Sequence, residues 1–406
     1  LTINFKGCKY MLIKNAKLAD KREVDVLIES GKFVKIEKNI ESTDSEVIDI
    51  EGKYLLPGMI DVHTHMREPG LTHKEGFSSG SRACAKGGVT TFADMPNTNT
   101  PTITVEALKE KRELAKGTSI VDYALHFGGS VNNNSEEIKK AEGVISTKVF
   151  LNVSTGKLLV EDDNVLDDIF KASKIVSVHA EEHMIDKAIS LAKKHGKKLY
   201  IAHISLASEL DAVREAKKTF EDVYVEVTPH HLFLTEEDAK HNPLLRMKPE
   251  LKAKSDVEAM WTGIADGTIN TIGTDHAPHL MSEKIEKLTF GIPGVEWALA
   301  LMLNAVNEGK ISLGKVIELY SETPAKIFRI KNKGKIEVGY DADFSIIDMD
   351  KKWVIKEEDT ISKCAWTPYN NWEIKGSIEA TYVRGSKVYE DNKFYENNGK
   401  EVELIG

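Results

Sequence analysis

The segment Asp61-Val-His63-Thr-His65-Met-Arg67 contains two histidines and an arginine whose side-chain types and spacing suit the binding of a metal ion and of an anion. They occupy alternate positions just after an apolar run, and alternate side chains of a β-strand point to the same side. Two imidazoles that face one point form half of a metal site, and a nearby guanidinium can hold a carboxylate through paired hydrogen bonds. The spacing therefore indicates a metal centre with an anionic substrate, or a strand end whose histidines only bond to backbone. His-x-His alone does not decide between them.

The composition is that of a globular protein. The chain has 406 residues, of which 41% are hydrophobic, and this is enough for a large core. Its net charge of −9 is spread along the chain, so we expect no nucleic-acid partner. Cys8, Cys84 and Cys364 lie far apart, which favours a reducing compartment over a disulfide framework. No apolar run approaches the ~18 residues of a membrane span, and no signal pattern is present. We expect a cytoplasmic protein without membrane partners.

Strand and helix patterns divide the chain into three zones. Residues 1–56 and 335–406 contain short β-type runs, and we expect these two ends to pair as one β-domain. In residues 57–334, eight apolar or β-branched runs alternate with segments of helical periodicity. The runs begin at Met59, Thr90, Val121, Thr147, Ile175, Leu199, Val223 and Ile269. Eight such units predict a closed (β/α)8 barrel, whose active site lies at the carboxyl ends of its strands.

Potential metal ligands lie at or near the ends of these runs. They are His63 and His65 at the first run, Lys148 in the fourth, His179 at the fifth, His203 at the sixth and Asp275 after the eighth. Any one of these residues could serve structure alone. Because all of them fall on the face that carries barrel active sites, together they predict a metal centre.

Lys148 lies inside a strand, where a charged ammonium is costly unless it is paired. A lysine with a lowered pKa can instead add CO2 and form a carbamate, whose two oxygens can bridge two cations. The alternative is a lysine that points to the helix layer and extends its charge to solvent.

Several longer motifs resemble the amidohydrolase superfamily and, within it, the dihydroorotases. The motifs are Leu56-Pro-Gly-Met-Ile-Asp-Val-His-Thr-His65, Asp94-Met-Pro-Asn-Thr98, Val178-His-Ala-Glu181, Thr228-Pro-His-His-Leu232, Thr274-Asp-His-Ala-Pro-His279 and Gly339-Tyr-Asp-Ala-Asp343. They extend over nearly the whole chain. The resemblance implies a distorted (β/α)8 TIM barrel at residues 57–334 and a β-sandwich domain formed by residues 1–56 and 335–406.

The resemblance also implies a reaction, which is the reversible, zinc-dependent cyclisation of N-carbamoyl-L-aspartate to (S)-dihydroorotate and water in pyrimidine synthesis. The implied ligands are His63, His65 and Asp275 for one Zn2+, His179 and His203 for a second, and a carboxylated Lys148 and a hydroxide as bridges. Asp275 would also act in catalysis by accepting a proton from the nucleophile and passing it to the leaving nitrogen. Homo-oligomers or association with other enzymes of the pathway are expected partners.

Substrate-binding roles are implied for a further set of residues. Arg67, Asn97 and His279 match the group that holds the dihydroorotate carboxylate. The backbone of Pro293 and Gly294 would touch the ring. Lys248 stands where the family more often has Asn or Arg as a further substrate contact, and a lysine there keeps a hydrogen-bond donor and adds a flexible positive charge.

Other interpretations of Arg67 and of the function stay open. Arg67 could form an ordinary ion pair with Glu68 or Glu75. Hydantoinases, dihydropyrimidinases and allantoinases resemble the chain in their metal ligands but act on other rings. A barrel of this kind can also lose its chemistry and serve as a non-catalytic scaffold. The presence of all six expected ligands favours an enzyme, and Arg67 favours a substrate with a carboxylate.

Overall fold

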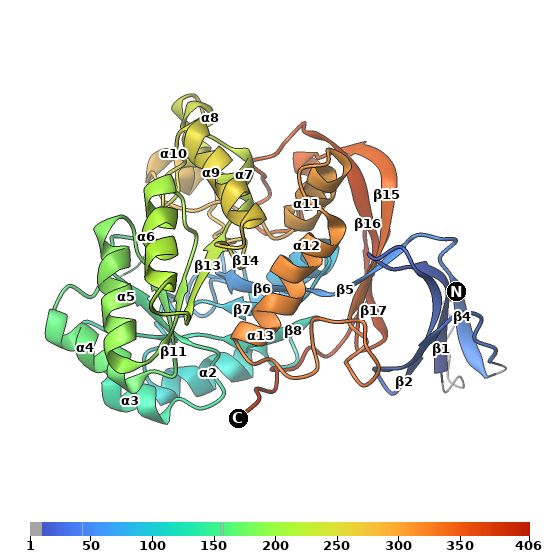
Figure 1. Ribbon diagram of the computed structural model, residues 1–406, viewed down its shortest axis with the longest axis horizontal. Coiled ribbons are helices and arrows are strands. Elements are labelled where there is room, and N and C mark those ends of the chain that lie inside the picture. Colours follow the sequence, from blue (N-terminus) through green and yellow to red (C-terminus); the bar gives the residue numbers. More distant parts are fainter. Residues whose placement is uncertain (1–9, 43, 155, 157) are drawn as a thin grey trace.

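A computed structural model describes residues 10–42, 44–154, 156 and 158–406. The predicted strands near the N-terminus lie within this part, whereas Cys8 lies outside it. Figure 1 shows a barrel of strands and helices beside a layer formed by the long strands β15 and β16 and the shorter β17, with the N-terminal strands β1, β2 and β4 beyond that layer. Among the described residues, no helix combines the length and apolar character needed to span a bilayer.

Each of the eight predicted runs contains a strand. These strands are β6 (Met59–Thr64), β7 (Val89–Asp94), β8 (Asp122–Leu125), β10 (Thr147–Phe150), β11 (Ile175–His179), β12 (Lys198–Ile201), β13 (Val223–Val227) and β14 (Thr271–Ile272), and the short β9 (Phe127–Gly128) follows β8. All their pairings are parallel. Parallel strands of a barrel are covered on both faces, which explains their nearly continuous apolar or β-branched sequences.

Two sheets, joined along both of their edges, close the barrel. One sheet has the order β6-β7-β8 and the other the order β14-β13-β12-β11-β10-β9. Only His126 separates β8 from β9, so the chain itself joins the sheets on one side. On the other side, Thr64 forms a parallel bridge with His276, and the His65 N–H donates to the His276 carbonyl at 2.8 Å. This closure brings the end of the first strand next to the segment that follows the last.

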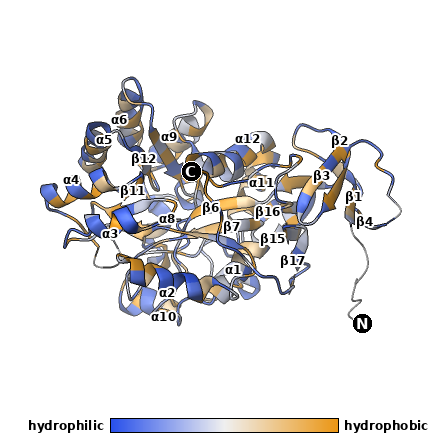
Figure 2. Cartoon of the chain, turned by 90° about the horizontal axis from the view of Figure 1, so that it is seen from below, coloured by the Kyte–Doolittle hydropathy of each residue, from blue (hydrophilic) through white to orange (hydrophobic). Residues whose placement is uncertain are grey.

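Helices surround the barrel. They are α1 (Phe77–Lys86), α2 (Val105–Ala115), α3 (Ser135–Lys140), α4 (Asp163–Ala172), α5 (His183–His195), α6 (Ala207–Lys217), α7 (Pro229–Phe233), α8 (Glu236–Lys240), α9 (Lys254–Ala265), α10 (Met281–Glu286), α11 (Ala298–Asn307), α12 (Leu313–Ile317) and α13 (Thr323–Ile327). Figure 2 shows hydrophobic colour on the central strands β6 and β7 and hydrophilic colour on the outer face of α2. The apolar faces of the helices thus cover the strands, and the loops at the barrel mouth remain for the site.

The two chain ends form one nine-stranded sheet. Its strands are β1 (Tyr10–Lys17), β2 (Glu23–Glu29), β3 (Lys32–Glu37), β4 (Ser45–Asp49), β5 (Tyr54–Pro57), β15 (Phe344–Val354), β16 (Glu373–Val383), β17 (Ser386–Glu390) and β18 (Lys393–Phe394). The ends meet where β15 pairs antiparallel with β5. The ring centroids of Phe33 in β3 and Phe344 in β15 are 6.2 Å apart, although three strands separate β3 from β15 in the sheet. The sheet therefore folds over a core of its own, as expected for a β-sandwich.

One detail of the β-domain differs from the sequence-based prediction. The sequence has two short β-type runs here, which begin at Asp343 and Trp353 and predict separate strands, but β15 continues through both and ends at Val354. A register shift in its pairing with β16 between Asp348 and Lys352 accommodates the polar residues that separate the runs. The final residues lie against the barrel, where Glu401 bridges Tyr123 and Leu404 bridges Ile330. The division at residues 57 and 335 stays a prediction.

Candidate active site

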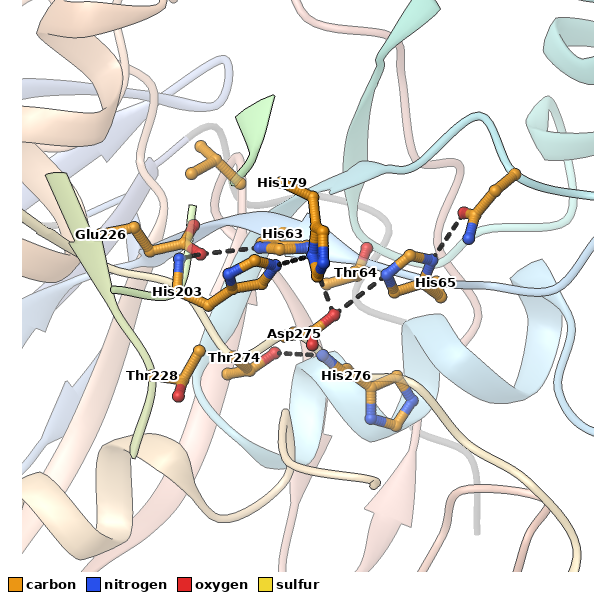
Figure 3. A network of polar contacts seen from close by, with 12 residues as sticks. His63, Thr64, His65, His179, His203, Glu226, Thr228, Thr274, Asp275 and His276 are labelled. Carbon is orange, nitrogen blue, oxygen red and sulfur yellow. Dashed lines mark hydrogen bonds and ion pairs between the residues drawn. The ribbon is translucent and has the colours of Figure 1, made fainter. Parts of the chain in front are cut away.

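The predicted ligands meet at the barrel mouth (Figure 3). Asp275 Oδ1 lies 3.2 Å from His63 Nε2 and 3.0 Å from His65 Nε2. His179 Nδ1 lies 2.8 Å from His203 Nε2. The side chains of His63, His203 and Asp275 place one ligand atom each within 4.8 Å of one another, as a metal site requires. All five residues are buried, so their ring and carboxylate atoms face the interior and not bulk water.

Lys148 Nζ and His203 Nδ1 lack a hydrogen-bond partner among the described residues, and His179 Nε2 has only a long contact of 3.5 Å with Glu181 Oε1 there. Buried polar atoms are nearly always paired, so an unpaired group of this kind needs an explanation. Imidazole nitrogens and a lysine amine are the groups that would hold a metal directly or through a carbamate. The donor set therefore fits a metal centre.

The carboxylates of the cluster favour positive charge, because Glu226 and Asp275 outweigh burial and raise the pKa of His63 to about 9. A bound metal would take the place of the proton that this charge attracts. Burial lowers the pKa of Lys148 to about 8, although Glu226 and Asp275 oppose the shift. Burial likewise lowers the pKa of His65 to about 3, so its imidazole is neutral and can act as a ligand. Asp275 behaves differently, because His63 and His65 overcome the effect of burial and hold its pKa well below the usual range. It is a carboxylate at neutral pH.

Glu226, which sequence reasoning missed, orients the first histidine. Its Oε1 lies 2.7 Å from His63 Nδ1 and accepts the His203 backbone N–H at 2.9 Å, and its Oε2 accepts the Tyr200 hydroxyl at 2.8 Å. A carboxylate on the far nitrogen of a ligand histidine fixes its tautomer and ring orientation. The sequence did contain a signal for Glu226: it is the single acidic residue in β13, whose other residues are apolar or aromatic. Because successive side chains of a strand point to opposite faces, Val225 and Val227 point away from the side that Glu226 faces.

The second histidine is oriented by an amide. His65 Nδ1 lies 2.8 Å from Asn97 Oδ1. Because the amide oxygen can only accept, Nδ1 carries the proton and Nε2 is left to face Asp275 and a metal. Asn97 was predicted to contact the substrate, and its place beside His65 gives it a second role.

The backbone is strained at three of these positions. His203, Asp275 and Arg67 have positive φ angles of 39°, 45° and 62°. Non-glycine residues in this region cost of order 1–3 kcal/mol and cluster at functional sites. Each of these residues follows the end of its strand, β6, β12 or β14, by two or three positions.

A pocket adjoins the ligand cluster. It is lined by His65, Arg67, Asn97, Ser154, Lys248, Asp275, Ala277, Phe290 and Gly291. Of four residues assigned to substrate binding (Lys248, His279, Pro293 and Gly294), only Lys248 lines this pocket. Lys248 lines the pocket and pairs with Glu250 at 3.0 Å, whereas His279 lies behind Arg67, 3.1 Å from its Nη2 atom. Pro293 and Gly294 lie outside the lining, and the Gly294 N–H donates to His276 Nδ1 at 3.2 Å. Phe290 and Gly291 from the same loop form the wall instead.

Arg67 is the distinctive residue of this pocket. Its side chain is buried, its Nε donates to the Pro278 carbonyl at 3.1 Å, and within the described part of the chain it forms no ion pair. The suggested pairs with Glu68 and Glu75 are not formed, because Glu68 accepts the Phe77 N–H at 2.9 Å and Glu75 binds Ser362. Nearby carboxylates, Asp275 first among them, stabilise its charge from a distance, but none of them contacts the guanidinium. Its Nη atoms are therefore placed to bind an anion that enters the pocket.

Comparison with known proteins agrees with this geometry. Residues 54–388 match the family model described as the amidohydrolase family, and the chain belongs to that family. Within it, the chain is 40% identical to the dihydroorotase of Pyrococcus abyssi over 90% of this chain and 91% of that relative. It is 34% identical to the dihydroorotase of Methanosphaera stadtmanae, with 97% and 99% covered. Among solved structures, the L-hydantoinase (dihydropyrimidinase) of Arthrobacter aurescens has a TM-score of 0.92 at 28% identity, with 97% and 99% covered.

Proposed function

We propose that this protein is a dihydroorotase, an enzyme that interconverts N-carbamoyl-L-aspartate and dihydroorotate in pyrimidine synthesis. The relatives of that name, at 34–40% identity over most of the chain, support the assignment. The observation that carries it is Arg67, a buried guanidinium in the pocket beside the ligand cluster. Both compounds carry a carboxylate that such a group binds, and a neutral hydantoin or dihydrouracil ring would leave it unpaired.

The enzyme uses a metal cofactor, as its family and its cluster of histidines and aspartate indicate. We assign His63, His65 and Asp275 to one Zn2+, His179 and His203 to a second, and a carboxylated Lys148 to both. The lowered pKa of Lys148 supports carboxylation, because only a neutral amine can attack CO2. Divalent zinc in such a site supplies Lewis acidity, which polarises a carbonyl and lowers the pKa of water to ~7.

The remaining steps fall to residues of the chain itself. In ring opening, a carboxylate oxygen of Asp275 accepts the proton of the nucleophile and then donates it to the ring nitrogen that leaves. In ring closure the same oxygen carries the proton in the opposite direction. Arg67, Asn97 and His279 hold the substrate carboxylate and so align the ring beside Asp275, which raises the rate through orientation. Lys248, Phe290 and Gly291 complete the pocket in this proposal, and the predicted backbone contacts of Pro293 and Gly294 with the ring would require the substrate to reach beyond the present lining.

A four-substrate assay tests the assignment. Purified protein with measured metal content is offered dihydroorotate, a hydantoin, dihydrouracil and allantoin. We expect turnover of dihydroorotate, with a kcat/KM at least about 100-fold above that for the neutral rings, since an unpaired buried charge is costly. Hydrolysis of a neutral ring without hydrolysis of dihydroorotate would instead make the protein a hydantoinase or dihydropyrimidinase, like the structures it resembles. Location in the cytoplasm and association with itself or with other enzymes of the pathway stay predictions.

A further inference from the structure

The imidazole of His279 lies between two cations. Its Nε2 atom is 3.1 Å from Arg67 Nη2, and its Nδ1 atom is 3.0 Å from Lys74 Nζ. The side chains of His279, Arg67 and Lys74 are all buried. Two further groups face the ring from other directions, the ammonium of Lys284 and the backbone carbonyl of Phe290. The backbone of His279 is itself held in place, because its carbonyl accepts the Trp366 indole N–H at 2.8 Å.

These contacts cannot both be ordinary hydrogen bonds. Burial, followed by the charges of Arg67 and Lys74, lowers the pKa of His279 well below its usual range, so the ring is neutral. A neutral imidazole has one N–H and one bare nitrogen, whereas a guanidinium and an ammonium can only donate. The bare nitrogen therefore accepts from one cation, and the other contact sets a donor against a donor.

Lys74 is the cation that lies outside the lining of the substrate pocket. Its Nζ lies 3.3 Å from Glu283 Oε2 in α10, and this carboxylate opposes burial and Arg67, which lower the pKa of Lys74. Glu283 is too far to compete for the ring, since its Oε2 is 3.7 Å from His279 Nδ1. Arg67, in contrast, lines the pocket; its Nε donates to the Pro278 carbonyl, and its guanidinium forms no ion pair among the described residues, so its Nη2 can turn to a substrate anion. The bare nitrogen is thus the one that faces Lys74.

We propose that Lys74 is a positioning residue for the substrate: its ammonium donates to His279 Nδ1 and fixes the imidazole proton on Nε2, beside Arg67. The inference rests on the proposed function. A carboxylate that enters the pocket accepts from both the Nε2–H and the guanidinium, and it relieves the contact between two donors. A neutral ring offers only carbonyl oxygens, without the second oxygen and the negative charge that would satisfy both donors at once. Lys74 thereby contributes to the selection of a carboxylate without touching the substrate.

Two variants and one matched control test this role. Lys74→Met removes the donor, and Lys74→Arg keeps a group that only donates. Lys287→Met removes another positive charge beside the same carboxylate, 3.9 Å from Glu283 Oε1, but from an exposed side chain that does not contact His279. The proteins are compared by bound metal, by kcat and KM for dihydroorotate, and by the ¹⁵N shifts of the His279 ring in labelled protein without substrate. A His279→Gln spectrum assigns the His279 signals.

We expect Lys74→Met to raise KM about 10- to 100-fold, the effect of one charge-assisted hydrogen bond, while kcat changes less than about 3-fold. Bound metal should not change. The ¹⁵N shifts of the His279 ring should indicate an unprotonated Nδ1 in the wild type and a mixture of the two tautomers in Lys74→Met. Lys74→Arg should have a KM close to the wild-type value, and Lys287→Met should resemble the wild type in every measurement.

Two results would overturn the proposal. One is a Lys74→Met protein with unchanged KM, and the other is wild-type protein whose His279 carries its proton on Nδ1. A loss of kcat and bound metal together would also count against it, since that indicates a structural role. If wild-type protein fails to turn over dihydroorotate, the proposed function fails, and the tautomer measurement still reports on Lys74 alone.

Discussion

At the scale of single residues, Lys148 is the side chain whose chemistry most needs a test. Its amine is buried and lacks a hydrogen-bond partner within the described residues, and its charge acts to lower the pKa values of His63, His179 and His203. Carboxylation would convert this cation into an anionic ligand and remove the cost of a buried positive charge. Without carboxylation, the ammonium would repel any metal ion held by the histidines.

Lys148→Ala should therefore lower bound metal and abolish measurable turnover of dihydroorotate. A short carboxylic acid such as propionate should restore part of both, because it can occupy the place of the carbamate. Metal analysis and rate measurements with and without the acid provide the check. Lys174→Ala, which removes an exposed lysine just before β11, is the control. Full activity and metal content in Lys148→Ala would refute the bridging role.

At the scale of elements, β13 supplies the acceptor that orients His63. Glu226 on this strand binds His63 Nδ1, the His203 N–H and the Tyr200 hydroxyl at once. Glu226→Gln preserves the shape of the side chain but removes its charge. We expect metal affinity to fall about 10- to 100-fold, as is usual when such a supporting group is lost. Competition with a chelator measures it, and Glu221→Gln, at an exposed position just before β13, should have no effect.

The short helix α7 carries a histidine whose protonation opposes folding. His231 Nε2 donates to the Pro249 carbonyl at 3.3 Å, so its Nδ1 accepts from the Thr228 hydroxyl at 2.8 Å. Burial, followed by the charge of Lys252, lowers the pKa of His231 from 6.5 to about 4. Between these pH values the unfolded chain binds a proton that the folded chain does not, so the free energy of unfolding falls as the pH falls.

A comparison of wild type with His231→Gln isolates this effect, since both proteins keep the same metal ligands. As the pH falls from 6.5 to 4, the wild type should lose about 3 kcal/mol more of its unfolding free energy than the variant. Urea unfolding at several pH values measures the difference. His183→Gln, which removes an exposed histidine at the start of α5, should show no such trend. Parallel pH dependence in wild type and His231→Gln would disprove the assignment.

The elements also explain what the sequence could and could not predict. Strands covered on both faces must be apolar throughout, so their ends, and the ligands at those ends, could be located from sequence alone. Glu226 lies inside such a strand, and only its neighbours in space give it a role. Lys74 and Phe290 come from loops, whose paths depend on long-range packing that no local pattern records.

At the scale of the whole molecule, a buried ionic cluster joins the barrel to the β-domain. Lys333 Nζ lies 2.7 Å from Asp122 Oδ2 at the start of β8 and 2.6 Å from Asp343 Oδ2, just before β15. Arg384, which follows β16, also pairs with Asp122. The cluster lies at the amino end of β8, away from the strand ends that carry the metal ligands. It should affect stability without affecting catalysis.

Lys333→Met tests this separation of roles, because it leaves Asp122 and Asp343 buried with too little positive charge. We expect a loss of about 3–5 kcal/mol in unfolding free energy, the usual cost of removing one partner from a buried ion pair. Below the unfolding transition, kcat and KM should match the wild type. Lys331→Met is the matched control, since Lys331 pairs with Glu403 at 2.8 Å on the surface, where solvent screens the interaction. If urea unfolding showed equal stabilities for the two variants, the cluster would not join the two domains energetically, and the apolar packing between them would have to do so.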